Sequence, residues 1–212
     1  MKELNKICKS YCISNTSSET AFNYHLSKIE HSHLSQTEIE NYFGQEQITQ
    51  GHIELLSNYK VWKNLSSSKK DQQYFVFHGS ESMPEGFSTI WDNFISKNLP
   101  EDFFVCFVGG YRTEDLTNIG VSEYNDFFCQ LTSNSTRSSI DCSFYIINKS
   151  AANLVCQHIS NQGFGTLDNS FLLNFFLDNK FFSSPEKIFL LKKPIKETFN
   201  SSTDFFLSLI HI

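Results

Sequence analysis

A short run of polar and small residues has the composition of a ligand-binding loop. His78, Gly79, Ser80 and Glu81 directly follow an aromatic, apolar run at 74–77. An imidazole, a hydroxyl and a carboxylate can hydrogen-bond a sugar or a phosphate, and two of these groups can also bind metal ions. The apolar run has no helical period and ends at glycine, which predicts a buried strand. In an α/β sheet, the loop after such a strand lies at the carboxyl edge, where ligands bind.

Strand-like and helix-like segments alternate along the chain and would position this loop. Strands are expected at 7–13, 74–77, 102–110, 140–147 and 187–191. Helices are expected at 17–29, 49–65, 87–97, 150–159 and 167–177, and a short helix with a loop at 31–47. Residues 113–139 show a weaker pattern. The alternation predicts one Rossmann-like α/β domain over 1–212, with a mostly parallel central sheet flanked by helices.

Charge and hydropathy exclude several classes of function. The formal net charge is −6 and the only arginines are Arg112 and Arg137, so the chain lacks the basic stripe that nucleic-acid binding needs. No apolar run is long enough for a transmembrane helix, and the N-terminus lacks the apolar core of a signal peptide. We therefore expect a cytoplasmic protein. The cysteines at 8, 12, 106, 129, 142 and 156 are scattered and lack zinc-finger spacing, which predicts free, buried thiols.

Four segments in order resemble glycosyltransferase family 25, which includes the lipopolysaccharide biosynthesis transferases. In 48–63, ITQGHIELLSNYKVWK, Gly51, Ser57 and Trp62 match the family pattern, whereas Asn58 stands where the family has His. The segment 74–87 resembles the family's strand, acidic triplet and downstream Pro-x-Phe. The segment LPEDFFVCFVGG at 99–110 is similar to the family's strand that ends in Leu-Gly-Gly. A weaker match at 143–168 ends in Thr-Leu-Asp.

The resemblance implies a GT-A-like domain that binds a nucleotide-sugar donor and a glycan or lipid-glycan acceptor. It implies a catalytic or acceptor-contacting role for Asp168, although a helix cap is an equal alternative for this residue. The substrate-binding residues that it implies come from the matched segments. They are Ser57, Asn58, His78, Gly79, Ser80, Glu81, Gly109 and Gly110.

The metal-binding part of the family pattern is degenerate in this chain. The family's acidic triplet (a DXD-type motif) aligns with His78, Gly79 and Ser80, and Glu81 comes one position too late. Mn²⁺ and Mg²⁺ select oxygen ligands, so no metal cofactor is predicted unless His78 or Glu81 acts as an unexpected ligand. Two functions stay open. One is a weakened or metal-independent transferase, and the other is an inactive pseudo-glycosyltransferase that serves as a binding or scaffold module. A third alternative is an unrelated α/β domain.

Overall fold

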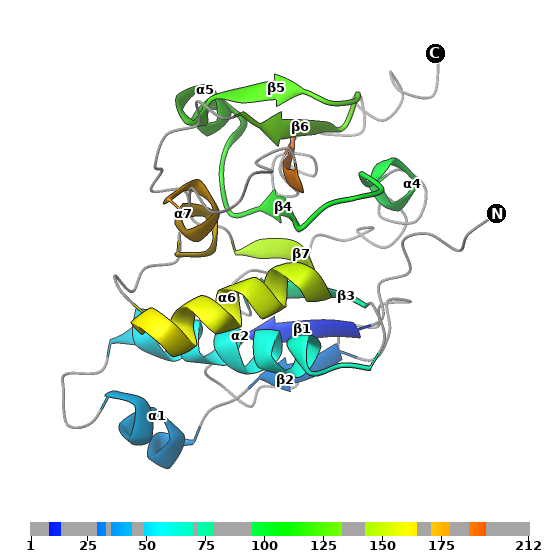
Figure 1. The fold of residues 1–212 in the computed structure, drawn as a ribbon. Helices are drawn as coiled ribbons and strands as arrows, with labels where there is room; N and C mark the ends of the chain where they lie inside the picture. Colours follow the sequence, from blue (N-terminus) through cyan, green and yellow to red (C-terminus); the bar gives the residue numbers. More distant parts are fainter. Residues whose placement is uncertain are drawn as a thin grey trace.

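A computed structural model describes residues 9–13, 29–32, 35–43, 49–69, 72–78, 95–132, 143–164, 171–178 and 187–193. Within these residues, an eight-stranded sheet has the order β2-β1-β3-β7-β4-β8-β6-β5 (Figure 1). Its strands are β1 (Lys9–Ile13), β2 (Ile29–Ser32), β3 (Gln73–His78), β4 (Val105–Gly109), β5 (Val121–Glu123), β6 (Phe128–Leu131), β7 (Phe144–Asn148) and β8 (Ile188–Leu191). The helices are α1 (Gln36–Phe43), α2 (Gln50–Ser66), α4 (Ser96–Asn98), α5 (Leu116–Ile119), α6 (Lys149–Gln162) and α7 (Phe171–Asp178), and a 3₁₀ turn, η2 (Thr113–Asp115), precedes α5.

The sheet is mixed, so the expectation of a mostly parallel sheet was wrong. Strand β7 runs antiparallel to both of its neighbours, β3 and β4, and β6 runs antiparallel to both β5 and β8. Only β1–β2, β1–β3 and β4–β8 pair in parallel. Two reversed strands, each between strands of the opposite direction, thus account for all the antiparallel pairs. Sequence did not reveal this because a strand buried on both faces is an apolar run whichever way it points.

Helices α2 and α6 lie side by side against one face of the sheet, as Figure 1 shows in cyan and yellow. The core on this side includes Trp62 and Leu65 of α2, Val155 of α6 and Leu173 of α7. The other face of the sheet forms a second core, rich in phenylalanine, that also includes Ile95 and Leu99 beside α4. Apolar layers on both faces explain why the central strands are apolar throughout.

The sequence of helix α2 explains where the helix begins and which residues share one of its faces. The Thr49 side chain accepts a hydrogen bond from the His52 N–H, and the His52 ring accepts one from the Thr49 N–H, which together form a capping box. Thr49, the first residue of the helix expected at 49–65, is therefore the N-cap. Glu54, Asn58 and Trp62 recur every four residues, so they lie in one stripe along the helix. This stripe carries the polar groups of the site described below.

Some expected elements differ from the structure. Strand β2 was not expected, because it joins the end of the helix expected at 17–29 to the start of the short helix and loop expected at 31–47. Strands β5 and β6 and helix α5 occupy the segment whose pattern was weak. Most of the expected helix at 17–29 and most of the one at 87–97 lie outside the described residues.

Two other expectations concern cysteines and membrane spans. The four cysteines in the described part of the chain, Cys12, Cys106, Cys129 and Cys156, are free and buried, as predicted. None of the described helices has the length and apolar character needed to cross a bilayer.

Candidate functional site at the carboxyl edge of the sheet

The carboxyl ends of β1 and β3 meet where the strand order reverses. Strand β1 lies between β2 and β3 and is parallel to both, so the chain passes to opposite sides of β1 when it forms these two strands. Ligands of open α/β sheets bind outside the carboxyl ends at such a topological switch point. Here the last paired residues are Ile13 and His78. The candidate loop residue His78 is thus the last residue of β3 and lies at the switch point.

His78 points toward α2 and away from solvent. Side chains alternate along β3, so His78 shares a face with Tyr74 and Val76, which belong to the core beneath α2. The residue is only 7% exposed. Its backbone N–H donates to the Ser143 carbonyl at 3.0 Å, where β7 begins. Its imidazole therefore needs hydrogen-bond partners within the protein.

Asn58 of α2 provides a hydrogen-bond partner, and Glu54 of α2 places its carboxylate near the ring. The Asn58 Nδ2 atom lies 3.3 Å from His78 Nε2, and it also donates to the Glu54 carbonyl oxygen at 2.8 Å. On the other side of the ring, His78 Nδ1 lies 3.7 Å from Glu54 Oε2. The Glu54 side chain is 18% exposed, so it is the member of this group that is most open to solvent.

The network continues from Asn58 into the core. Tyr145 of β7 donates its hydroxyl hydrogen to Asn58 Oδ1, and Trp62 Nε1–H donates to the Tyr145 hydroxyl oxygen at 2.9 Å. Trp62 and Tyr145 are each 2% exposed. The chain of contacts thus runs from the half-buried Glu54 at the carboxyl edge to a fully buried indole.

The donors in this network determine its direction and the tautomer of His78. An indole can only donate, so the Tyr145 oxygen accepts from Trp62 and its own hydrogen goes to Asn58 Oδ1. Asn58 therefore presents its NH₂ group to His78, and Nε2 must accept. We assign the remaining proton to Nδ1, which faces the Glu54 carboxylate. This assignment describes a neutral imidazole.

This arrangement makes His78 a poor ligand for a hard divalent cation. Both ring nitrogens face protein partners, and an imidazole is not the donor that Mg²⁺ or Mn²⁺ prefers. Within the described residues, no group of three His, Cys, Asp or Glu side chains could hold a metal ion. Glu81, the other candidate ligand, lies outside the described residues, as do Gly79, Ser80 and Asp168.

The remaining predicted residues lie near this edge but have local structural roles. Ser57 is 2% exposed and donates its hydroxyl to the Ile53 carbonyl one helical turn back, at 2.8 Å. Gly109 is opposite Phe144 in the ladder, and a Cβ at this position would lie 3.0 Å from the Phe144 ring. Gly110 has a φ of 88°, a left-handed conformation that favours glycine.

His78, Gly109 and Gly110 therefore lie at the same edge of the sheet, at the carboxyl ends of β3 and β4. Strands β3 and β4 point the same way because both are antiparallel to β7, which enters between them from this edge. Phe144 pairs with Phe77 on one side and with Gly109 on the other. Among the predicted residues that the structure describes, Asn58 and His78 are in direct contact through their side chains.

Sequence reasoning missed Glu54 and Tyr145. The spacing of Glu54, Asn58 and Trp62 was a usable signal, since residues four apart share a helix face. Tyr145 gave no local signal, because its contact with Asn58 joins residues 87 apart in sequence. Comparison with known proteins found no protein-family model that matches this chain, and no curated protein that matches it.

Proposed function

We propose that this chain is a divergent family 25-like glycosyltransferase that binds a nucleotide-sugar donor at the carboxyl edge and does not depend on a divalent cation. One observation carries the proposal. The strand of the segment that resembles the family's metal-binding motif is β3, which ends at the switch point between β1 and β3, and ligands of open α/β sheets bind at such points.

The network around His78 supports the metal-independent form of this activity. In the proposed alignment, Asn58 and His78 are two positions at which the chain departs from the family, and their side chains lie 3.3 Å apart. The departures therefore lie in one local environment. A transferase without a Lewis acid needs other groups to stabilise charge on the leaving diphosphate, and this loss is worth several kcal/mol. A weak activity is the expected consequence.

The environment of the His78 ring also favours a second candidate. This is a pseudo-glycosyltransferase that binds the nucleotide-sugar donor and does not transfer the sugar. His78 has both nitrogens engaged by Asn58 and Glu54, so it presents neither a free base nor a free ligand. A binding or scaffold module would keep the donor-binding edge and lack turnover. The two functions differ in whether a product forms and agree on where the donor binds.

The test is donor binding with and without metal. Calorimetry with a panel of UDP- and CMP-sugars should detect a binder whose affinity is the same in EDTA and in Mn²⁺. Backbone amide NMR should then show shifts at Ile13, His78 and Gly110 and none at Val121, which lies in the edge strand β5. Binding that appears only with Mn²⁺, or no binding by any donor, would contradict the proposal.

Product analysis separates the two functions once a donor is known. Mass spectrometry of reactions with that donor and glycan acceptors should show slow transfer or slow donor hydrolysis, unchanged by EDTA. Complete absence of both products, in a protein that binds the donor, would assign it to the pseudo-enzyme alternative.

A further inference from the structure

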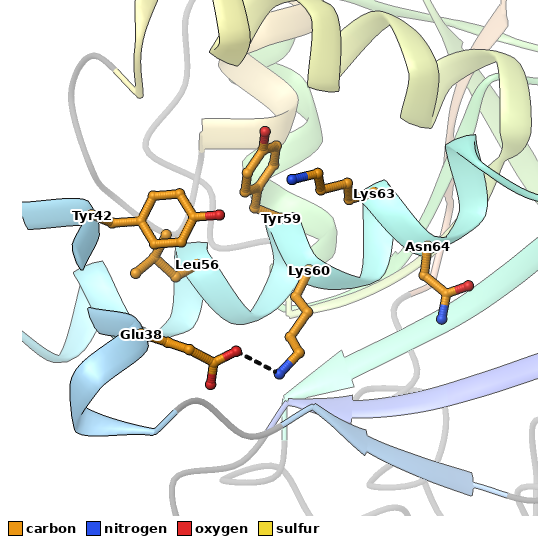
Figure 2. A pocket seen from close by; sticks show the side chains of 7 residues that line it. All are labelled: Glu38, Tyr42, Leu56, Tyr59, Lys60, Lys63 and Asn64. Atoms are coloured by element: carbon orange, nitrogen blue, oxygen red, sulfur yellow. Dashed lines mark hydrogen bonds and ion pairs between the residues drawn. The ribbon is translucent and has the colours of Figure 1, made fainter. Parts of the chain in front are cut away.

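A groove between α1 and α2 has the composition of a second binding site. Its volume is about 340 Å³, within the range of small-ligand sites. Figure 2 shows its side chains, with Glu38 and Tyr42 from α1 and the others from α2. Leu56 is 1% exposed and contributes an apolar floor. None of its lining residues belongs to the network around His78.

The groove combines an exposed aromatic ring with polar side chains. Tyr42 is 49% exposed, unusually open for an aromatic residue. Its ring packs edge-to-face on Tyr59 at 6.2 Å and on Phe164 at 6.2 Å, which holds it in place without covering it. A fixed, half-exposed tyrosine ring offers an apolar surface on which the C–H face of a sugar ring can pack. Asn64, also in the lining, donates from Nδ2 to the Tyr11 hydroxyl at 3.1 Å, which fixes its amide.

The charges of the groove favour a ligand with one negative charge. Lys60 forms an ion pair with Glu38 at 3.1 Å, so these two charges compensate each other. Lys63 lies over the Tyr59 ring at 5.7 Å, and in the described part of the chain it forms no ion pair with a carboxylate. Figure 2 shows Lys63 extending toward Tyr59 and Lys60 extending toward Glu38. The net charge of the lining is therefore +1, supplied by Lys63.

We infer that this groove binds a sugar that carries one carboxylate, a uronic-acid type of residue. The Lys63 ammonium would pair with the carboxylate, a charge-assisted contact. The Tyr42 ring would support the pyranose face, and the Asn64 amide would contact a hydroxyl. A phosphate carries up to two negative charges, whereas the lining has a net charge of +1 and no arginine, so it suits a singly charged carboxylate better. The inference rests on the proposed function for its role, since it makes the groove a subsite for an acidic acceptor.

The test uses the intact chain and two simple probes. Methyl β-D-glucuronide is titrated by NMR, and methyl β-D-glucoside, which lacks the carboxylate, is the matched probe. We expect the glucuronide to bind at least tenfold more tightly and to shift the amides of Tyr42, Lys60 and Lys63. This preference should weaken as salt rises, because the groove is open and its charges are screened.

Two variants and a control locate the contact. Lys63→Met should lower glucuronide affinity about tenfold, the usual scale of one charge-assisted hydrogen bond, and Tyr42→Ala should weaken both probes. Lys97→Met makes the same charge change on α4, far from α1 in Figure 1, and should change neither. Equal binding of the two probes, no binding at 20 mM (about the weak limit of such contacts), or an equal loss in Lys97→Met would overturn the inference.

These outcomes are distinguishable from failure of the proposed function. Glucuronide binding without any nucleotide-sugar binding would keep the groove and refute the transferase. Donor binding at the carboxyl edge without glucuronide binding would keep the transferase and refute the groove. A circular dichroism melt of each variant shows that a loss of binding is not a loss of folding.

Discussion

The substitution Tyr145→Phe tests the buried network most directly. It removes one hydroxyl and changes the shape of the side chain little, so it creates almost no cavity. The Trp62 indole N–H and the Asn58 Oδ1 atom both lose their partner, and these residues are 2% and 6% exposed. Each buried polar group left without a hydrogen bond costs about 1–3 kcal/mol. For two such groups, we therefore expect the free energy of unfolding to fall by about 2–6 kcal/mol.

Urea unfolding measures this difference in the free energy of unfolding. If only stability has changed, the slope of that free energy against urea concentration should be the same in the variant and the wild type. Tyr124→Phe is the matched control, because Tyr124 is 47% exposed and loss of a surface hydroxyl costs less than about 0.5 kcal/mol. If the losses in unfolding free energy of Tyr145→Phe and of the control differ by less than about 0.5 kcal/mol, the Tyr145 hydroxyl does not stabilise the fold by pairing with Trp62 and Asn58.

The same variant makes a second prediction about His78. In the wild-type protein, long-range ¹H–¹⁵N spectra should show a protonated Nδ1 and an unprotonated Nε2, because Asn58 donates to Nε2. Without the Tyr145 hydroxyl, Asn58 loses one of the contacts that orient its amide, and the tautomer preference should weaken. A wild-type ring protonated at Nε2 would refute the assigned direction of the network.

Three further predictions concern other parts of the fold. Gly109→Ala should lower the free energy of unfolding by about 1–3 kcal/mol in urea, because the new Cβ would lie 3.0 Å from the buried Phe144 ring and force it to shift; an unchanged midpoint would refute this close approach. The hydrogen bond from the Ser35 N–H and the contact with Lys60 lower the pKa of the Glu38 carboxyl group from 4.5 to about 2. The stability that this carboxylate contributes should therefore be complete above pH 4.5 and should be lost as the pH falls toward 2. A carboxyl NMR titration with a midpoint near 4.5 would contradict that shift. Burial raises the pKa of the Cys12 thiol to about 11, so alkylation at pH 8 should modify it only after denaturation, and equal rates in native and denatured protein would count against its burial.

The sequence predicted the elements that carry a strong local signal. Helix α2 was clear because its apolar period and its cap at Thr49 agree, and β3 was clear because an aromatic run ends at a glycine. The direction of β7 was not predictable, since its partners lie far away in sequence and its apolar pattern is the same in either direction. Strand β2 was missed because its sequence, IEHS, has no alternation of apolar and polar residues.

The candidate site was predictable in its location and not in its chemistry. The apolar run at 74–77 predicted from the sequence alone that His78 lies where a strand ends, and the structure confirms this position. Whether its ring would be open or engaged depended on Asn58 and Glu54, which approach from a helix that ends several residues before β3 begins. Side-chain partners across elements are set by packing, and a single sequence does not specify them.

The contact between Asn58 and His78 bears on the proposed function, because both residues depart from the pattern of the family that we propose. Under the proposed alignment, the family places a histidine at position 58 and a carboxylate at position 78, and an imidazole N–H can donate to a carboxylate. This chain places an amide donor at Asn58 and an imidazole acceptor at His78, 3.3 Å apart. In this chain a donor on the helix thus faces an acceptor at the strand end, and the negative charge is absent from the strand end. An amide N–H can donate to an imidazole nitrogen or to a carboxylate, so the hydrogen bond from Asn58 does not require a charge at the strand end. Replacing both keeps the hydrogen bond and removes the oxygen ligand that a divalent cation needs, which is why we place metal independence at the centre of the proposed function.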